Sequence, residues 1–558
     1  MKSGYAQLGL LLADGDVYAA WYREALGHAG LPYVEVERTM LDYIDHLDVL
    51  LLCGASVLSA SEQSSIQAWQ EQGGRLVVSG STWGLSAEIG LRHVSDQRYS
   101  RARIEAPETS DRLWPDGSAA SLFFGGERAE AIDGKCVLAE SNGECLLKRT
   151  ARAIYFGPHV GRTLSLMLMG RAVSCDAVGP GDDSIDLADG VLRAEDGTVF
   201  DYAKDRECVE GCPSPIFATP HADVIREIWI RAIVESIETC EKPFYLLWKW
   251  PDNAKTVATA GIDCDIPDVD TVMQIRRIMM NFGMRPAWMV APPGLPADVL
   301  RLLRDWGHSI GLLYRESVDG ENVGLRTQHL MVSRTAGSKG VSCVRPEDGR
   351  WQGYTRFYAS AERAGSRLSL SKGGVQPGSV GYLFGTCQMF RPLRFGGEPF
   401  EIRELPYCAH LPGTTTPLAA IHKLISSTAR VEGCFQFSLR VSKCVDQNSE
   451  RHLQDTLMLL KQSRFRFFSP DELYWHDQAR RDVWIKESVT GLSLVCKRDA
   501  PGFTLMLLGA GLEATSSNKN FTPAPEVRYG TLFTPFVINL EQKTQLDISF
   551  DFDSSVAA

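Results

Sequence analysis

The sequence has no long hydrophobic run, no excess of positive charge and no clustered pairs of cysteine. None of its apolar stretches reaches the roughly 20 residues of a membrane-spanning helix. The net charge of −11 argues against a nucleic-acid-binding surface. The 14 cysteines are scattered, many inside apolar runs, which is typical of buried free thiols in a reducing cytoplasm. We therefore expect a cytoplasmic location, with no transmembrane segment and no nucleic-acid partner.

The N-terminal sequence lacks the features of a signal peptide. A short apolar run at residues 8–12 is followed at once by Asp14 and Asp16, and no small-residue cleavage site comes after them. This run is interpreted as the first strand. A chain of 558 residues is too long for one hydrophobic core, so about three or four domains are expected.

In residues 1–242, apolar runs alternate with helical patterns. The expected strands are 8–12, 33–36, 49–52 and 75–79, and the expected helices are 17–28, 59–72 and 224–238. Strands that alternate with helices predict a doubly wound parallel α/β domain. From about residue 100 to 212, short β-prone runs alternate with turns rich in Gly and Asp, which predicts a β-rich insertion.

Two residues of this domain could carry chemistry. Ser81 ends the run Val77-Val-Ser-Gly-Ser81, where a nucleophile could follow a strand, and Cys53 ends an earlier strand. The strand–helix pattern resembles the class I glutamine-amidotransferase-like fold, whose active members place a Cys on such a turn. No Gly-x-Cys-x-Gly occurs here, so we expect the domain to be catalytically silent.

The stretch from Thr259 to Asp268 joins a β-prone run to two acids, Asp263 and Asp265. Extended residues at i and i+2 point the same way, so both carboxylates could face one pocket. In parallel α/β folds, chemistry gathers at the carboxyl ends of strands. The alternative is that Asp265 and Asp268 cap the next helix. Repeated strand–helix units over 243–486 predict a distorted (β/α) barrel.

Two further motifs, Gly307-His-Ser-Ile-Gly311 and Arg345-Pro-Glu-Asp-Gly349, accompany the paired acids. With them, residues 255–470 resemble the polysaccharide deacetylase superfamily, which comprises carbohydrate esterases with a distorted (β/α) barrel. The resemblance implies that Asp263 is the catalytic base, that Arg345 holds it in place and that Asp265 is a metal ligand. His308 matches a position beside the metal ligands and is the second candidate for a metal site.

The chain departs from this family at the metal site, which in the family is an Asp and two histidines. Leu313 and Ser317 stand where the histidines are expected, and Arg440 stands where a late histidine would act as general acid. Leucine cannot ligate a metal, and arginine stays protonated and repels a cation. Catalytic zinc needs three protein ligands, so no cofactor is expected unless other residues rebuild the site.

Two functions follow from these residues. The first is a non-catalytic pseudoenzyme in a biosynthetic pathway, in which Trp351, Tyr354, Gln388 and Arg440 bind a carbohydrate-like or anionic ligand, or a partner protein. The alternative is an active, divergent, metal-dependent deacetylase of an N-acetylated sugar or small amide, with zinc. The sequence leaves open which of them holds, as well as the ligand and the oligomeric state.

Residues 487–558 have a different pattern. Apolar and polar residues alternate over short runs that are separated by turn signals, which predicts an antiparallel β-sandwich. Such a module could bind sugars or only pack against the other domains.

Overall fold

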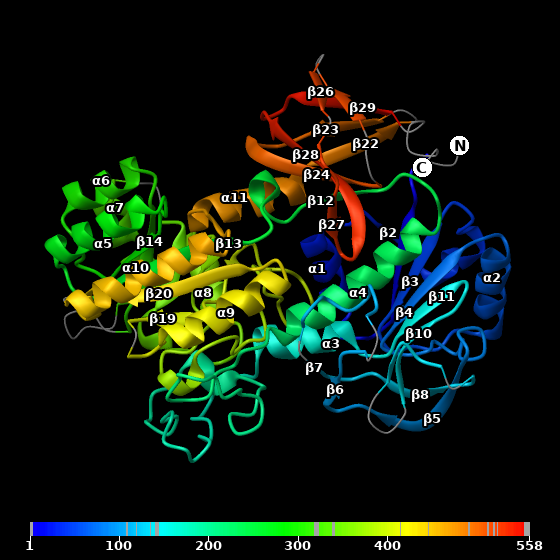
Figure 1. The fold of residues 1–558 in the computed structure, drawn as a ribbon, viewed down its shortest axis with the longest axis horizontal. Helices are drawn as coiled ribbons and strands as arrows, with labels where there is room; N and C mark the ends of the chain where they lie inside the picture. Colours follow the sequence, from blue (N-terminus) through cyan, green and yellow to red (C-terminus); the bar gives the residue numbers. More distant parts are fainter. Residues whose placement is uncertain are drawn as a thin grey trace. The chain divides into compact units, whose positions relative to one another are not determined.

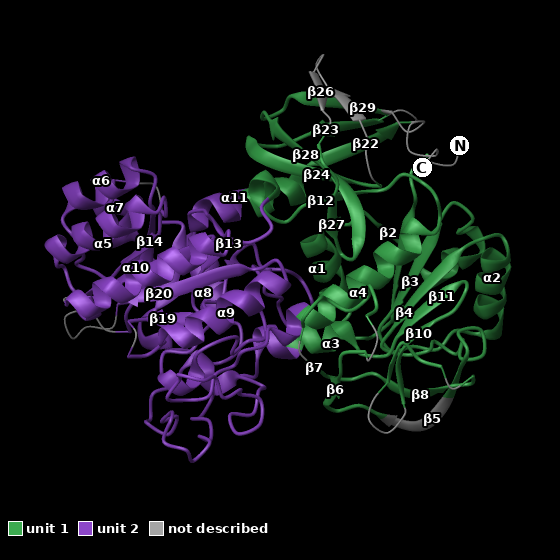
Figure 2. Cartoon of the chain, viewed as in Figure 1, with its two compact units in different colours: residues 1–165, 224–253, 476–558 green, residues 166–223, 254–475 purple. Residues whose placement is uncertain are grey.

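The structure is a computed structural model. It describes the chain except for residues 1–3, 108–109, 119, 134, 140–143, 317–322, 338–340, 413, 445, 489–490, 510–512, 517–518, 522 and 552–558. The chain forms two compact units that are interleaved in sequence (Figure 2). Unit 1 comprises 1–165, 224–253 and 476–558, and unit 2 comprises 166–223 and 254–475. The predicted boundaries at 242 and 486 stay a prediction.

Unit 1 is built on a sheet with the order β2-β1-β3-β4-β11-β10-β9 (Figure 1). Its strands are β1 (Leu8–Leu12), β2 (Val34–Glu35), β3 (Val49–Cys53), β4 (Arg75–Ser79), β9 (Leu138–Ala139), β10 (Cys145–Arg149) and β11 (Ala153–Phe156). Neighbouring strands from β2 to β11 in this order pair in parallel, and β10 and β9 add an antiparallel edge. The helices are α1 (Ala20–Ala29), α2 (Ala60–Glu71), α3 (Val160–Leu164) and most of α4 (His221–Glu238).

The region predicted as a β-rich insertion divides in two. Its first part contributes β9, β10 and β11 to the sheet of unit 1, the antiparallel pair of β6 (Ala102–Ile104) with β7 (Ser121–Phe123), and β8 (Glu127–Ala131), which pairs with β5 (Leu91–Arg98) just before the insertion. Residues 166–223 belong to unit 2. Apart from isolated β-bridges, the structure assigns to the described residues of this segment the short helical turns η2 (Ser165–Met169) and η3 (Ala194–Gly197) and the start of α4.

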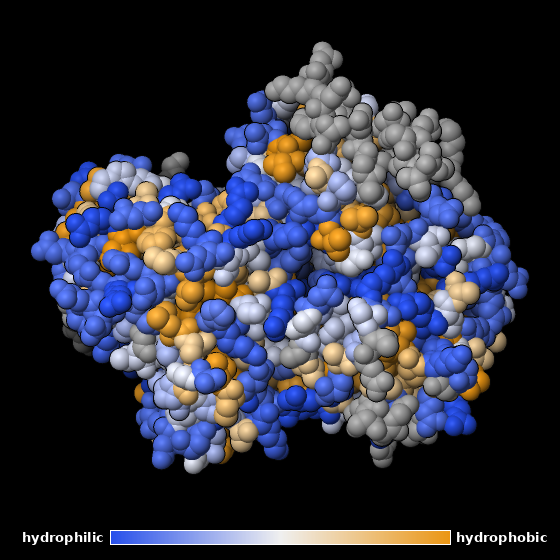
Figure 3. All heavy atoms as spheres, in the orientation of Figure 1, coloured by the Kyte–Doolittle hydropathy of each residue, from blue (hydrophilic) through white to orange (hydrophobic). Residues whose placement is uncertain are grey.

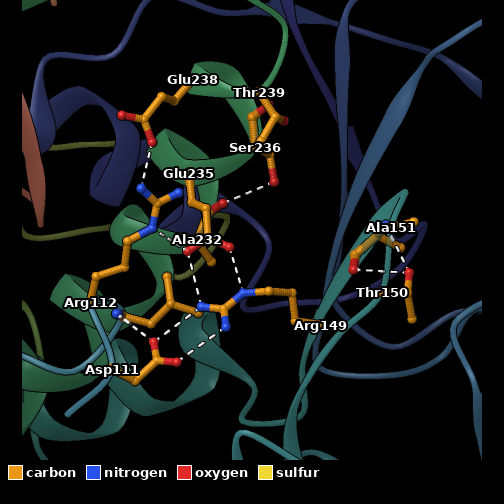
Figure 4. A network of polar contacts seen from close by, with 12 residues as sticks. Asp111, Arg112, Arg149, Thr150, Ala151, Ala232, Glu235, Ser236, Glu238 and Thr239 are labelled. Carbon is orange, nitrogen blue, oxygen red and sulfur yellow. Dashed lines mark hydrogen bonds and ion pairs between the residues drawn. The ribbon is translucent and has the colours of Figure 1, made fainter.

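A network of charged groups fixes α4 within unit 1 (Figure 4). The buried carboxylate of Glu235 accepts hydrogen bonds from Arg112 at 2.8 Å and from Arg149 at 3.0 Å. Arg149 also donates to Asp111 at 3.1 Å, and Arg112 reaches Glu238 one helical turn further on. Two guanidinium groups on one carboxylate compensate for its burial.

The C-terminal residues of unit 1 form two antiparallel sheets that share an apolar core, which includes Leu494, Phe503, Phe536 and Phe550. The strands are β12 (Tyr245–Leu247), β22 (Trp484–Ser488), β23 (Gly491–Val495), β24 (Ala500–Leu508), β25 (Glu513–Ser516), β26 (Lys519–Phe521), β27 (Glu526–Arg528), β28 (Thr531–Leu540) and β29 (Gln545–Asp551). Alternation of apolar and polar residues predicts strands here, but β12 comes from more than 200 residues earlier in the chain.

Unit 2 is a mixed α/β structure whose parallel sheet curls into a half-barrel (Figure 1). The order is β18-β17-β16-β15-β14-β13-β20-β19, and β21 also pairs with β13. The strands are β13 (Val257–Cys264), β14 (Ala287–Val290), β15 (Ser309–Tyr314), β16 (Cys343–Pro346), β17 (Leu368–Ser369), β18 (Arg403–Glu404), β19 (Ala409–Leu411), β20 (Cys434–Arg440) and β21 (Arg466–Phe467). This is consistent with the predicted deacetylase-like barrel.

Helices follow most of these strands. They are α5 (Val269–Asn281), α6 (Ala297–Asp305), α7 (Leu325–Thr335), α8 (Arg356–Ala364), α9 (Leu418–Arg430), α10 (Gln447–Gln462) and α11 (Pro470–Asp482). All eight residues of β13 are buried, as is usual for a parallel strand covered on both faces. Asp268 caps α5 by accepting hydrogen bonds from the backbone of Asp270 and Thr271. Asp265 therefore is not needed as the cap of this helix.

The surface agrees with a chain that folds around buried cores. The face drawn in Figure 3 is mostly hydrophilic, with small apolar patches scattered over it. Among the helices of the described residues, none has the length and hydropathy that crossing a membrane requires.

Candidate functional site

The carboxyl end of β13 holds a buried ion pair. Asp263 is 4% exposed and accepts a hydrogen bond of 2.8 Å from Nη1 of Arg345, which comes from β16. Burial raises the pKa of Asp263 above its ordinary value, although the positive charge of Arg345 opposes this. The Nε of Arg345 donates to the carbonyl of Leu370 at 2.7 Å. A Cβ on Gly261 would lie 2.7 Å from the guanidinium, so this approach needs a glycine.

Asp265 lies beyond the end of β13 and is half-buried. It accepts hydrogen bonds from the backbone N–H of Ser442, at 3.1 Å, and from the hydroxyl of the same residue. Its own carbonyl accepts from Arg315 at 2.9 Å, and Arg315 also pairs with Glu347 at 2.8 Å. The carboxylate predicted to bind a metal is therefore engaged by a serine from the segment after β20.

Arg440 is the last residue of β20 and is aligned with Asp263 across the sheet. Its guanidinium contacts Asp348, the residue after the Arg-Pro-Glu run. Burial works to lower the pKa of Arg440, but the carboxylates of Asp263 and Asp348 raise it above its ordinary value. Arg440 is thus a permanent positive charge at the mouth of the half-barrel.

His410, on β19, joins this group and was not predicted from the sequence. It is 7% exposed, and its Nδ1 lies 2.6 Å from the hydroxyl of Ser438 on β20. Burial and the positive charges of Arg440 and Arg345 lower its pKa to about 3, so the ring is neutral at physiological pH. The signal that could have found it is a histidine near the end of a short apolar run that Pro412 terminates.

Three of these residues, Asp348, His410 and Arg440, line a cavity of about 380 Å³. It is lined by Asp186, Asp189, Arg193, Asp348, Val375, Gln376, His410, Pro412, Thr414, Thr415, Arg440 and Lys443. The first three come from the segment 166–223, and the rest come from the half-barrel. Arg193 and Asp189 form an ion pair at 2.7 Å. The wall therefore presents cations, carboxylates and hydroxyls together, which suits a small polar ligand rather than an apolar one.

The residues present do not fit the zinc site of the deacetylases. Within the described part of the chain, no three His, Cys, Asp or Glu side chains are grouped so that they could hold a metal ion. Leu313, at the position expected for the first histidine, is a buried hydrophobe that is 1% exposed. Ser317, at the position expected for the second, lies outside the described residues.

His308 and Asp265 are not brought together. Asp263, Met289 and Gly311 are aligned across β13, β14 and β15, which puts His308 at the amino end of the sheet. Its separation from Asp265 along the strand direction is about five residues, or about 16 Å. His308 packs edge-on against Trp288 instead. Burial lowers the pKa of His308 to about 4.

The remaining predicted ligand-binding residues lie in different places. Gln388 is fully buried and donates to the carbonyl of Val431 at 2.9 Å, near the start of β20 and not at its carboxyl end. Trp351 packs against Tyr358 at a ring distance of 5.0 Å and lines a second cavity. Tyr354 lies edge-on to Phe395. Of this predicted set, Arg440 is the residue at the cavity of the half-barrel mouth.

Comparison with known proteins shows similarity of fold to several solved structures. The sequence matches no protein-family model, and it matches no curated protein. The structure is similar to that of Agd3, described as a novel carbohydrate deacetylase, over 99% of both chains, with 9% identity and a TM-score of 0.46. A family 4 carbohydrate esterase from Bacillus anthracis matches over 40% of this chain and 85% of that chain, with 14% identity and a TM-score of 0.25.

A mutant of a family 4 pseudoenzyme with restored enzymatic activity matches over 40% of this chain and 68% of that chain, with 12% identity and a TM-score of 0.25. The structures similar to this chain thus include carbohydrate esterases of the deacetylase kind. The resemblance of residues 1–242 to glutamine amidotransferases stays a prediction.

Proposed function

We propose that unit 2 binds a small carbohydrate-like ligand in the cavity at the mouth of its half-barrel and does not hydrolyse it by the metal-dependent route. The observation that carries this proposal is Arg440. It puts a permanent positive charge into the cavity wall, level with Asp263, where a hydrolase of this kind has its general-acid histidine. A guanidinium repels a metal ion and attracts a carboxylate or a hydroxyl-rich ligand.

The lining suggests how such a ligand is held. Arg440 and Lys443 donate to its acidic or hydroxyl oxygens, and Thr414 and Thr415 exchange hydrogen bonds with its hydroxyls. The carboxylate of Asp348 contacts Arg440 and fixes the direction of its guanidinium. Next to this wall, Asp263 is aligned with Arg440 across the sheet and is held by Arg345. A sugar acid or an amino sugar matches such a set of donors and acceptors.

The alternative is a divergent metal-dependent deacetylase with Asp263 as base and Asp265 as ligand. The buried Asp263, whose pKa is raised, and its bond to Arg345 favour it, because a catalytic base benefits from both. It requires metal ligands that the described residues do not group together.

Titration calorimetry of the full chain with glucuronate, glucosamine, N-acetylglucosamine and glucose tests the proposal. We expect at least one of the first three to bind, and Arg440→Ala to weaken that binding by about tenfold or more. Arg277→Ala, which removes an exposed arginine of α5, is the matched control and leaves binding unchanged. Failure of all four sugars to bind contradicts the proposal.

Elemental analysis separates the two functions. After dialysis against zinc and then buffer, the wild type and Asp265→Ala are expected to contain the same, substoichiometric amount of metal. One equivalent of zinc in the wild type that disappears in Asp265→Ala contradicts the non-catalytic proposal and favours the deacetylase.

A further inference from the structure

Unit 2 has a second cavity, of about 810 Å³, that the function proposed above does not use. Its lining comprises Tyr314, Glu316, Gly324, Leu325, Arg326, Thr327, Pro346, Arg350, Trp351, Gln352, Arg356, Phe357, Ser360 and Arg363. No residue lines both cavities. Four arginines and one glutamate give this wall an excess of positive charge, although the whole chain has a net charge of −11.

Three of the four arginines have no carboxylate partner among the described residues. Arg350 pairs with Glu316 at 3.0 Å, and Arg363 donates to the carbonyl of Ala359 on its own helix. Arg326 and Arg356 form no ion pair with any described residue, and both are exposed to solvent. An exposed pair of unpaired guanidinium groups on one cavity wall is a site at which an anion gains two partners at once.

Aromatic side chains form another part of the same wall. The ring centroids of Trp351 and Phe357 are 5.1 Å apart, and Trp351 is almost fully buried. Phe357 and Tyr314 are only half-buried, so parts of their rings remain open to the cavity. Aromatic faces pack against the apolar faces of sugar rings, whereas arginines take the charged substituents.

Two helices also begin at this cavity. Residues at the start of α7 and α8 line it, and neither helix has a side-chain hydrogen bond at its N-cap. The positive ends of both helix dipoles add to the field of the arginines. This contribution is secondary, because it is the arginines that distinguish the cavity from an ordinary helix start.

We propose that this cavity is a second ligand site, which binds an anionic sugar. A carboxylate or phosphate on the sugar lies between Arg326 and Arg356 and forms paired hydrogen bonds with their guanidinium groups, and the sugar ring lies against Tyr314 and Phe357. Uronates and sugar phosphates share this chemistry. The site is independent of the cavity that contains Arg440, so it stands whether or not a ligand binds there.

Titration of the full chain with digalacturonate, glucose 6-phosphate and uncharged maltose tests the site. We expect at least one of the two anions to bind and maltose to bind about tenfold or more weakly. The anion that binds identifies the charged group as carboxylate or phosphate. Binding that weakens when salt is raised from about 50 to about 200 mM confirms the electrostatic contribution.

Matched variants locate the binding. The double variant Arg326→Ala/Arg356→Ala is expected to weaken binding of the anion by about tenfold or more. Arg334→Ala removes an exposed arginine of the same helix α7 that does not line the cavity, and it leaves binding unchanged. Both variants are also made in an Arg440→Ala background, so that an acidic sugar held at the half-barrel mouth does not contribute to the measured binding. Thermal melting verifies that the variants are folded.

The proposal is overturned if neither anion binds at concentrations up to about 10 mM. It is also overturned if, in the Arg440→Ala background, binding is already lost or survives in the double variant, because the anion is then held elsewhere.

Discussion

The two parallel sheets of the protein both gather polar residues at their carboxyl ends, with different results. In unit 1, the side chains of Asp16, Tyr22, Ser79 and His159 are buried and form hydrogen bonds with one another. Nε2 of His159 lies 2.9 Å from Asp16, and the hydroxyl of Tyr22 lies 3.2 Å from Ser79. In unit 2, Arg440 and its neighbours line a cavity. The same position in a fold thus becomes structural where groups satisfy each other, and available for a ligand where they face open space.

The hydrogen bonds of His159 also fix the orientation of its ring. The backbone N–H of Arg162 donates to its Nδ1 at 3.1 Å, and its Nε2 lies 2.9 Å from a carboxylate oxygen of Asp16. A histidine that faces an aspartate resembles a catalytic arrangement, but neither Cys53 nor Ser81, the candidate nucleophiles among the described residues of this domain, has a hydrogen bond to it. Burial raises the pKa of Cys53, which keeps it a thiol, and Ser81 donates to the carbonyl of Gly54. These contacts favour the predicted catalytic silence.

The largest effect on stability is expected at Arg345, a buried residue at the sheet end that has the cavity. This residue lies at the end of unit 2 for which we propose ligand binding, but its pair with Asp263 is buried, with side chains 4% and 6% exposed. Arg345→Met leaves a buried carboxylate without its partner, which should cost about 3–5 kcal/mol of the free energy of unfolding. Urea denaturation measures it.

The control for Arg345 is Arg315→Met. Arg315 lies nearby, but its ion pair with Glu347 is partly exposed, so its loss should cost about 1 kcal/mol or less. Adding Asp263→Asn to Arg345→Met should recover part of the loss, because the uncompensated charge is then removed. Equal losses for Arg345→Met and Arg315→Met would mean that burial does not make Arg345 structural.

How far the sequence predicted this site depends on how local each signal is. Asp263 and Asp265 follow a single β-prone run, and Arg345 belongs to a short motif, so they could be found by reading along the chain. His308 was misplaced as a companion of Asp265, because a count of residues along one motif does not tell at which end of the strand a side chain lies. The register of β15 decides that, and it depends on pairing with β14.

Other parts of the site could not be predicted, because they depend on contacts between distant segments. His410 reaches the cavity through the pairing of β19 with β20, and neither strand carries a motif around it. Asp186, Asp189 and Arg193 come from an irregular segment that was assigned to the first domain from composition alone. Such a segment has no periodicity, so only tertiary packing places it at the half-barrel.

A smaller loss of stability is expected when a hydrogen bond is removed from the buried group Asp16, Tyr22, Ser79 and His159 at the sheet end of unit 1. Asp16→Ala removes a buried acceptor from the Nε2–H of His159, which should cost about 2–3 kcal/mol. Asp14→Ala is the control, because that side chain is 80% exposed and its pair with Arg38 should be worth about 1 kcal/mol or less. If Asp16→Ala and Asp14→Ala lower stability by equally small amounts, the pair of Asp16 and His159 does not stabilise this end of the sheet.

The pH dependence of the same variant sharpens this test. Burial alone would raise the pKa of Asp16, but hydrogen bonds from His159 and from the backbone of Tyr18 and Ala55 lower it below its ordinary value. A lowered pKa means that the folded state binds the proton less tightly than the unfolded state. The contribution of Asp16 is therefore full at neutral pH and is lost as the pH falls below the ordinary aspartate value of 3.8. Thermal melting of the wild type and Asp16→Ala should converge on acidification.

The smallest effect is expected for the pH dependence of ligand affinity at His410, which lines the cavity of unit 2 but is itself buried. Because its pKa is lowered to about 3, it should stay neutral from pH 5.5 to pH 8. Asp189, on the same cavity wall, has a lowered pKa because of its bond to Arg193, so it stays charged over this range. The affinity of a ligand whose own charge is constant should then change by less than about twofold. Nuclear magnetic resonance titration of the His410 ring, with free imidazole as the standard, checks the cause. Tighter binding of an acidic ligand at pH 5.5, together with titration of this ring, would show that His410 takes up a proton there. The charge of this cavity wall would then vary with pH, and His410 would not behave as a buried residue.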